Sequence, residues 1–130
     1  MSKFIGTTGL LGLLGVVLGA FGAHGLEERL IANGHLDDWG TATFYLFVHV
    51  LALFVLSICM RSYRSPVLKV IAWFWMGGIF IFSGSLYSLA LTDISKLGII
   101  TPLGGVLFIA GWGCLAWAGF RNSMKSIEGS

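Results

Sequence analysis

The side chain with the most chemical potential in this sequence is His49, which lies deep inside an apolar stretch over residues 41–60. In a helix, at 1.5 Å per residue, His49 would lie about 12 Å from the start of that stretch. Tyr45 precedes His49 by one turn, and Ser83 lies at a similar depth in another apolar stretch, one turn from Tyr87. We expect these side chains to meet in one polar layer, together with residues at nearby helix ends. The candidate polar pocket consists of His49, Tyr45, Ser83, Tyr87, His24 and Thr101.

Two interpretations of His49 are open at this point. An ionisable residue within a membrane span is a functional hypothesis by default, here as a ligand or proton site. A neutral imidazole that bonds to a serine or tyrosine also joins helices structurally, contributing about 0.6 kcal/mol on average. Burial favours the neutral ring in either case.

Metal and haem sites fit these residues poorly. Bis-histidine haem ligation needs two rings at one depth on facing helices, whereas His24 lies at a helix end and His35 in a loop. Cys59 and Cys114 lie toward the half of the bundle away from the histidines, which leaves zinc without a ligand set and disfavours a disulfide. We therefore predict no metal and no cofactor.

The sequence also offers no convincing catalytic set. Ser83 with His49 is the only candidate pair of nucleophile and base in the apolar stretches, and it has neither an orienting acid nor an evident oxyanion donor. Coupled transport usually uses an acid or a cation deep in the membrane, and none lies there. We predict that the protein is not an enzyme and has no catalytic residue.

The composition is that of a membrane protein. Of 130 residues, 56% are hydrophobic and 11% charged, whereas a soluble domain carries about a quarter charged residues. Four continuous apolar stretches each approach the ~20 residues that cross a ~30 Å hydrocarbon core. They predict an all-α bundle of four transmembrane helices in one membrane domain, residues 1–130, with helices at 4–23, 38–60, 66–91 and 102–120. The net charge of +2 is too small to suggest nucleic-acid binding.

The first apolar stretch also resembles a signal peptide, because Lys3 precedes it and Ala20-Phe21-Gly22 would pass as a cleavage site. The run is nearly long enough to span a membrane, so we expect a retained helix.

The distribution of cations predicts the orientation. With four spans, the N-terminus, the loop at residues 61–69 and the C-terminus share one side of the membrane. That side carries Lys3, Arg61, Arg64, Lys69, Arg121 and Lys125. The other side carries only Arg29 and Lys96. By the positive-inside rule, both termini are expected in the cytoplasm.

Several local signals predict where helices begin. Ser65-Pro66 and Thr101-Pro102 each place a hydroxyl at an N-cap and a proline at the first helical position. Asp37 or Asp38 could cap the second span in the same way. The loop before it, residues 24–39, is either a short amphipathic surface helix that ends at Asn33-Gly34 or a solvated connector.

The glycines predict how the helices meet. Small residues let helix backbones approach closely in lipid, and spacings of three, four and seven place glycines on one face. We interpret these faces as the bundle interior or an oligomer interface, although Gly104-Gly105 could instead line a ligand cavity. The predicted helix-packing residues are Gly12, Gly15, Gly19, Gly22, Gly77, Gly84, Gly104 and Gly111.

Several strings resemble one family. They are Gly-Ala-Phe-Gly-Ala-His at 19–24, Tyr45 with His49, Phe-Ser-Gly-Ser-Leu-Tyr at 82–87, and Thr-Pro-Leu-Gly-Gly at 101–105 followed by Gly111-Trp112. On these strings the chain resembles the YgdD/YwdK-type family of small bacterial inner-membrane proteins, whose function is unassigned. The resemblance implies a four-helix, multi-pass protein of the bacterial inner (plasma) membrane. It implies no activity, substrate or catalytic residue.

Three functional hypotheses follow. The leading one is a non-enzymatic membrane protein whose candidate polar pocket, in the outer half of the bundle, holds a lipid headgroup, a quinone or a partner helix. The second is an accessory subunit that packs against a larger membrane complex. The third is a small transporter or channel formed by an oligomer, because four short helices enclose little room. The expected partners are membrane lipid and either a homo-oligomer or a larger membrane complex, with no nucleic acid.

Overall fold

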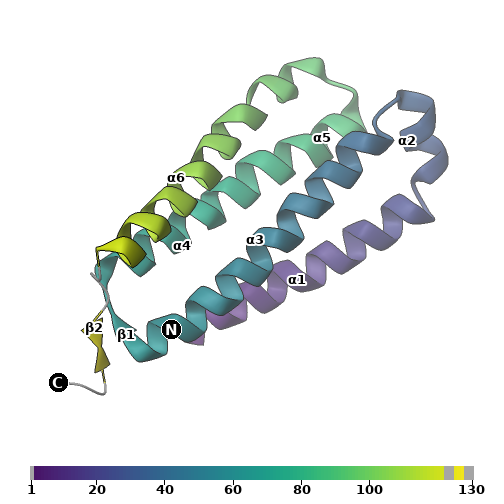
Figure 1. Ribbon diagram of the computed structural model, residues 1–130. Coiled ribbons are helices and arrows are strands. Elements are labelled where there is room, and N and C mark those ends of the chain that lie inside the picture. The colour runs from purple at the N-terminus through teal and green to yellow at the C-terminus, as the bar shows by residue number, and fades with distance from the viewer. Residues whose placement is uncertain (1, 122–124, 128–130) are drawn as a thin grey trace.

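The computed structural model describes residues 2–121 and 125–127, and nearly all of them are helical (Figure 1). Four helices are long and apolar enough to cross a membrane, as the sequence predicts. They cover Lys3–Ala23, Leu36–Ser62, Pro66–Thr92 and Ser95–Phe120.

The first span is α1 (Ser2–Ala23) and the second is α3 (Leu36–Ser62). The third is one rod of three pieces: α4 (Pro66–Gly78), the π-helical segment η1 (Ile79–Ser83) and α5 (Gly84–Thr92). The fourth is α6 (Thr101–Phe120), which comes directly after the 3-10 segment η2 (Ser95–Ile99) and Ile100. The loop after α1 contains a short helix, α2 (Glu27–Asn33), so it is not merely a connector. Gly34 ends α2 in the left-handed conformation, with φ of 72°.

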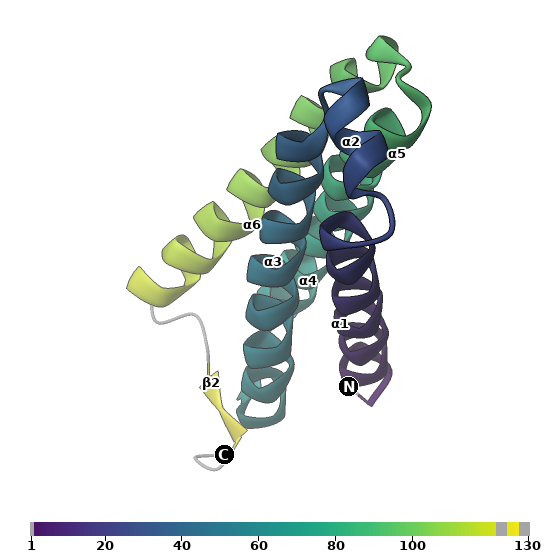
Figure 2. The ribbon, with the colours of Figure 1, turned by 90° about the vertical axis from the view of Figure 1, so that its right-hand side faces the viewer.

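Helix α3 is the central element of the bundle. α1 packs mainly against α3, α6 packs mainly against α4 and η1, and α3 contacts all three pieces of the third span (Figure 1). Figure 2 shows that α6 leans away from α3 toward its own C-terminal end. Two short strands, β1 (Tyr63–Arg64) and β2 (Lys125–Ser126), pair antiparallel beside the α3–α4 turn.

The two ends of the bundle differ in charge. The end with the start of α1, the α3–α4 turn and β2 is called the cationic end here, and it carries Lys3, Arg61, Arg64, Lys69, Arg121 and Lys125 (Figure 2). The opposite end, with α2 and the α5–α6 connection, is called the acidic end, and it carries Glu27, Glu28, Asp37, Asp38 and Asp93.

Glycines on α1 make room for side chains of α3. A Cβ on Gly15 would lie 2.5 Å from a methyl group of Leu46, and a Cβ on Gly22 would collide with the indole of Trp39. That indole also donates a 2.9 Å hydrogen bond to the carbonyl oxygen of Leu18. A Cβ on Gly12 or on Gly19 would make only an ordinary contact with a side chain of α3, at 3.7 and 3.6 Å respectively. The two helices therefore meet at close backbone range.

The contact between α6 and the third span is closer still. A Cβ on Gly104 would collide with the backbone nitrogen of Phe82, and a Cβ on Gly111 would collide with the indole of Trp75. On the third span, a Cβ on Gly77 would lie 3.2 Å from a methyl group of Leu107, which is a tight contact. Of the two glycines considered for a ligand cavity, Gly104 is buried against Phe82, and a Cβ on Gly105 would lie 3.8 Å from the ring of Phe82.

Gly84 departs from the expected packing face, because nothing lies within 4 Å of its would-be Cβ. Gly77 and Gly84, seven residues apart, would share a face on a regular α-helix. The π-helical turn at Ile79–Ser83 inserts an extra residue between them and rotates the C-terminal part of the span around the helix axis. Gly84 therefore faces away from the helix contact.

Two of the predicted helix starts also differ. The N-cap of α6 is Ile100, so Thr101 is already inside the helix. The N-cap of α3 is His35, and Asp37 and Asp38 lie in the first turn, where their charges still suit the helix dipole. Ser65 is the N-cap of α4, as expected, but its side chain makes no capping hydrogen bond.

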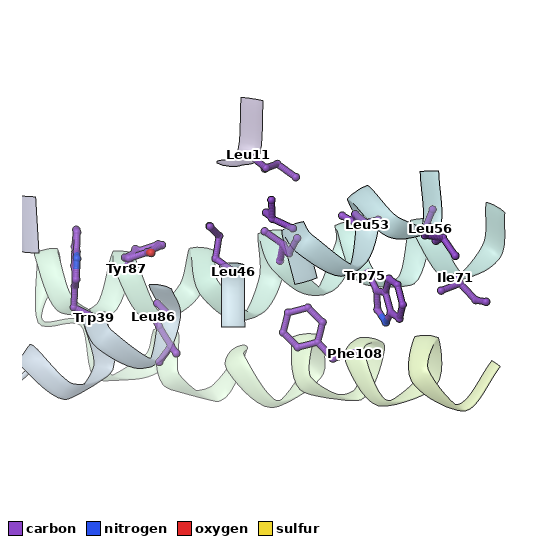
Figure 3. Packing of buried hydrophobic residues seen from close by; sticks show 14 of the residues in the cluster. Leu11, Trp39, Leu46, Leu53, Leu56, Ile71, Trp75, Leu86, Tyr87 and Phe108 are labelled. Atoms are coloured by element: carbon purple, nitrogen blue, oxygen red, sulfur yellow. The ribbon is translucent and has the colours of Figure 1, made fainter. Parts of the chain in front are cut away.

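The core runs along the contact between α3 and the third span. Figure 3 shows Leu46, Leu53 and Leu56 of α3 facing this core, with Trp75 and Phe108 between the helices. Leu11 of α1 closes the core from the other side of α3.

The tight glycine contact gives a first prediction. Gly104→Ala should destabilise the bundle by about 1–3 kcal/mol, because its methyl group must displace the backbone of Phe82. Gly113→Ala in the same helix is the matched control, since nothing lies within 4 Å of its Cβ position. Thermal melting in mild detergent measures both variants. Equal melting temperatures for the two would contradict the close contact between α6 and the third span.

Candidate functional site

His49 is buried between α3, the third span and α6, with 2% of its surface exposed. Its Nδ1 lies 2.8 Å from the carbonyl oxygen of Tyr45, and its Nε2 lies 3.1 Å from the indole nitrogen of Trp112. An indole N–H can only donate, so Nε2 must accept and carries no proton. Nδ1 therefore carries the proton and donates it to Tyr45. The two partners define a neutral imidazole with both nitrogens satisfied.

Aromatic rings enclose this imidazole. The ring of Phe108 stacks on His49, with centroids 3.6 Å apart and planes 10° apart. Trp75 and Trp112 each present an edge-on contact at 6.1 Å, and their own ring centroids are 4.6 Å apart. Such an enclosure keeps water away and strengthens the two hydrogen bonds of the ring.

Trp75 is the exception to this satisfied interior. Among the residues that the structure describes, its indole nitrogen is the one buried side-chain N or O atom without a hydrogen-bond partner. Figure 3 shows the nitrogen pointing toward α6, where Gly111 faces the indole. The indole ring of Trp75 occupies the space that is free because Gly111 has no side chain.

The other members of the candidate polar pocket form separate pairs. Ser83 donates a 2.8 Å hydrogen bond to the carbonyl oxygen of Ala42. The hydroxyl of Tyr87 lies 2.7 Å from that of Thr43. Each bond joins α3 to the third span.

Thr101 is paired with Ser85 rather than with His49. Their hydroxyls lie 2.6 Å apart and join α5 to the start of α6. Tyr45 offers its backbone carbonyl to His49, while the residue is 38% exposed and its ring contacts Phe82. His24 is exposed beyond the end of α1, beside a shallow cavity lined by Ala20, Phe21 and Gly25.

The structure therefore does not gather the candidate polar pocket into one open cavity. Depth alone put His49 and Ser83 at one level, but a side chain's direction around the helix decides its partner. The π-helical turn that ends at Ser83 changes this direction, and Ser83 meets the backbone of α3. The polar groups are dispersed as links between helices.

Sequence reasoning missed the partners of these groups, which are Trp112, Phe108, Thr43 and Ser85. The signal for Trp112 was available, because an indole in the middle of a span needs an acceptor and His49 offers one at mid-depth. The hydroxyls of Thr43 and Ser85 gave no such signal, since a hydroxyl in a helix commonly bonds to a carbonyl of its own preceding turn.

A second polar cluster lies at the acidic end. His35 Nδ1 is 2.8 Å from a carboxylate oxygen of Asp38, and its Nε2 is 2.7 Å from one of Asp93. Arg29 of α2 donates a 2.8 Å hydrogen bond to the carbonyl oxygen of Leu91. The cluster ties α2 and the start of α3 to the end of α5, where Asp93 has φ of 57°.

The two carboxylates favour the charged form of His35. The hydrogen bond to Asp38, followed by that to Asp93, raises the pKa of His35 above its ordinary value of 6.5. Within residues 2–121 and 125–127, no group of three or more His, Cys, Asp or Glu side chains could hold a metal ion.

An open groove of about 470 Å³ lies between α1 and α3 near the acidic end. It is lined by Gly19, Gly22, Ala23, Leu36, Trp39, Gly40, Thr43 and Phe44. Nothing lies within 4 Å of the position where Gly40 would carry a Cβ. We call this feature the α1–α3 groove.

Comparison with known proteins identifies the family. Residues 18–105 match a family described as "Protein of unknown function (DUF423)". The chain belongs to the DUF423 family. A UPF0382 membrane protein of Staphylococcus saprophyticus is 45% identical over 121 residues, which are 93% of this chain and 99% of that relative. The UPF0382 membrane protein YwdK of Bacillus subtilis is 45% identical over 113 residues, 86% of this chain and 91% of its own.

These relatives agree with the four apolar helices, and the chain is a membrane protein. The DUF423 match covers His49, Ser83, Thr101 and the His35 cluster, whereas Trp112 lies beyond its end. No solved structure matches the chain.

The His35 cluster predicts a pH dependence of stability. A raised pKa in the folded state means that the stabilisation is complete below about pH 6.5 and is lost as the pH rises through the raised pKa. The melting temperature in detergent should therefore fall as the pH rises above about 6.5. His35→Gln should remove this fall, whereas His24→Gln, outside the cluster, should keep it. An unchanged pH dependence in His35→Gln would contradict the role of the cluster.

Proposed function

We propose that this protein is a non-enzymatic accessory subunit, which packs its α1–α3 groove against a transmembrane helix of a larger membrane complex. The observation that carries the proposal is the groove itself, which has a floor of small residues and is not filled at Gly40 by any described side chain. Glycine and alanine at such a surface let a second helix approach to backbone distance.

The state of the polar side chains supports a non-enzymatic role. His49, Ser83, Tyr87 and Thr101 are each held by a partner inside the bundle. A general base or nucleophile must instead reach a substrate within hydrogen-bond range. These four residues serve better as links between helices.

A lipid chain or a quinone is the second candidate for the same groove. The observation in its favour is the wall, which is mostly apolar and includes Trp39 and Thr43, whose methyl group faces Gly19. This second candidate retains the hypothesis of a binding pocket in the outer half of the bundle, but the pocket is lined by the residues of the α1–α3 groove and not by those of the candidate polar pocket.

We further propose that the protein lies in the bacterial inner membrane with its cationic end in the cytoplasm. Six cations at that end against Arg29 and Lys96 at the other support this orientation. The α1–α3 groove would then open in the outer half of the bilayer.

Photo-crosslinking in native membranes tests the accessory role. A benzoylphenylalanine at Phe44, which lines the groove and is 64% exposed, should give one discrete adduct with another membrane protein. The same probe at Ile109, exposed on α6, should not give that adduct.

A groove-filling variant makes the test specific. Gly40→Leu has room in the fold of this chain and occupies the groove, so it should abolish the Phe44 adduct. Gly113→Leu, which also meets nothing within 4 Å, is the matched control and should leave the adduct intact. An adduct that survives Gly40→Leu would overturn the proposal. So would an adduct with lipid, quinone or a second copy of this chain alone.

A further inference from the structure

A second open cavity lies at the cationic end, far from the α1–α3 groove. It measures about 510 Å³ and lies between the start of α1 and the α3–α4 turn. Its lining combines cationic, polar and apolar side chains: Phe4, Met60, Tyr63, Arg64, Ser65, Pro66 and Lys69.

Positive charge gathers at this cavity, and none of the described residues that line it carries a carboxylate. Arg64 and Lys69 line the cavity, and the β1–β2 register places Lys125 directly opposite Arg64. Like charges opposite one another on paired strands repel and are destabilising. All acidic residues that the structure describes lie at the acidic end. Among the described residues, Arg64 and Lys69 form no ion pair. An anion from outside the chain would relieve this repulsion.

The helix that begins at the cavity adds to the positive potential. α4 starts at Pro66, and its first turn contains Lys69. The N-terminal end of a helix carries a partial positive charge, and Ser65 makes no capping hydrogen bond that would offset it. The first turn of α4 therefore favours an anionic group in the same space as the two cations.

The remaining lining is apolar. Phe4 and Met60 are half-buried, and Tyr63 and Pro66 extend the apolar wall beside the charged side chains. A small hydrated anion gains nothing from such a wall. An amphiphile whose phosphate meets the cations and whose chains run along Phe4 and Met60 matches both parts of the lining.

We propose that this cavity is a binding site for an anionic phospholipid, with Arg64 and Lys69 holding the headgroup phosphate. Basic residues near the membrane surface attract anionic lipids by about 1 kcal/mol each, which corresponds to about fivefold in affinity. The site is independent of the accessory role and of the α1–α3 groove.

Native mass spectrometry of the full chain released from nanodiscs tests the site. Discs with phosphatidylglycerol in phosphatidylcholine should yield protein that keeps one phosphatidylglycerol. Arg64→Gln with Lys69→Gln should lower this retention by roughly 30-fold, and Lys69→Gln alone by about fivefold. Arg121→Gln is the matched control, because Arg121 lies at the same end but stacks on Trp117, 5.5 Å from its ring centroid.

Further variants and probes separate lipid binding from folding and from the binding of a free phosphate compound. The charge-retaining pair Arg64→Lys and Lys69→Arg should bind as the wild type does. All variants should melt at the wild-type temperature in discs of phosphatidylcholine alone, if the substitutions leave the fold intact. Equal retention of the two lipids by the wild type, or unchanged retention in the double variant, would overturn the proposal. Full competition by soluble glycerophosphoglycerol would also overturn it, because the ligand would then be a free phosphate compound.

Discussion

The structure depends on one constraint: a polar group inside the hydrocarbon region must find its partner within the protein, because water does not reach it. His49 meets this constraint with two bonds, to the Tyr45 carbonyl and to the Trp112 indole. Ser83 and Tyr87 meet it through Ala42 and Thr43. The bonds of Ser83, Tyr87 and Trp112 each join two helices, and the bond to the Tyr45 carbonyl fixes the orientation of the His49 ring. The bonds that satisfy the polar groups therefore also determine how the helices are arranged.

The glycine contacts make these short bonds possible. Gly104 brings the backbone of α6 against Phe82, and Gly111 admits the indole of Trp75. Only at this separation can side chains of α6 reach into the gap between α3 and the third span, where Phe108 stacks on His49. The interior is thereby filled by aromatic rings and hydrogen-bonded polar groups, with the indole nitrogen of Trp75 as the exception among the described residues. The open features at the surface include the α1–α3 groove and the cavity of the cationic end.

The sequence predicted the spans because length and hydropathy decide them without reference to tertiary contacts. It predicted the glycine faces of α1 and α6 from regular helical spacing, and this failed for Gly84, where the π-helical turn breaks the spacing. It placed His49 at mid-depth but not beside Trp112, because depth gives a level in the bundle and not a direction around the helix. The His35 cluster escaped prediction because Asp38 and Asp93 are 55 positions apart and meet only after α3 and α5 have packed.

The most direct test of the satisfied interior is the tautomer of His49, measured by ¹⁵N nuclear magnetic resonance of the histidine-labelled protein in lipid bicelles at neutral pH. The account predicts a neutral ring with its proton on Nδ1, and an Nε2 signal that shifts when Trp112 is replaced by Phe. The Nδ1 proton should exchange slowly with water, because Phe108, Trp75 and Trp112 surround the ring. A charged ring, a proton on Nε2, or an Nε2 signal indifferent to Trp112→Phe would contradict the account.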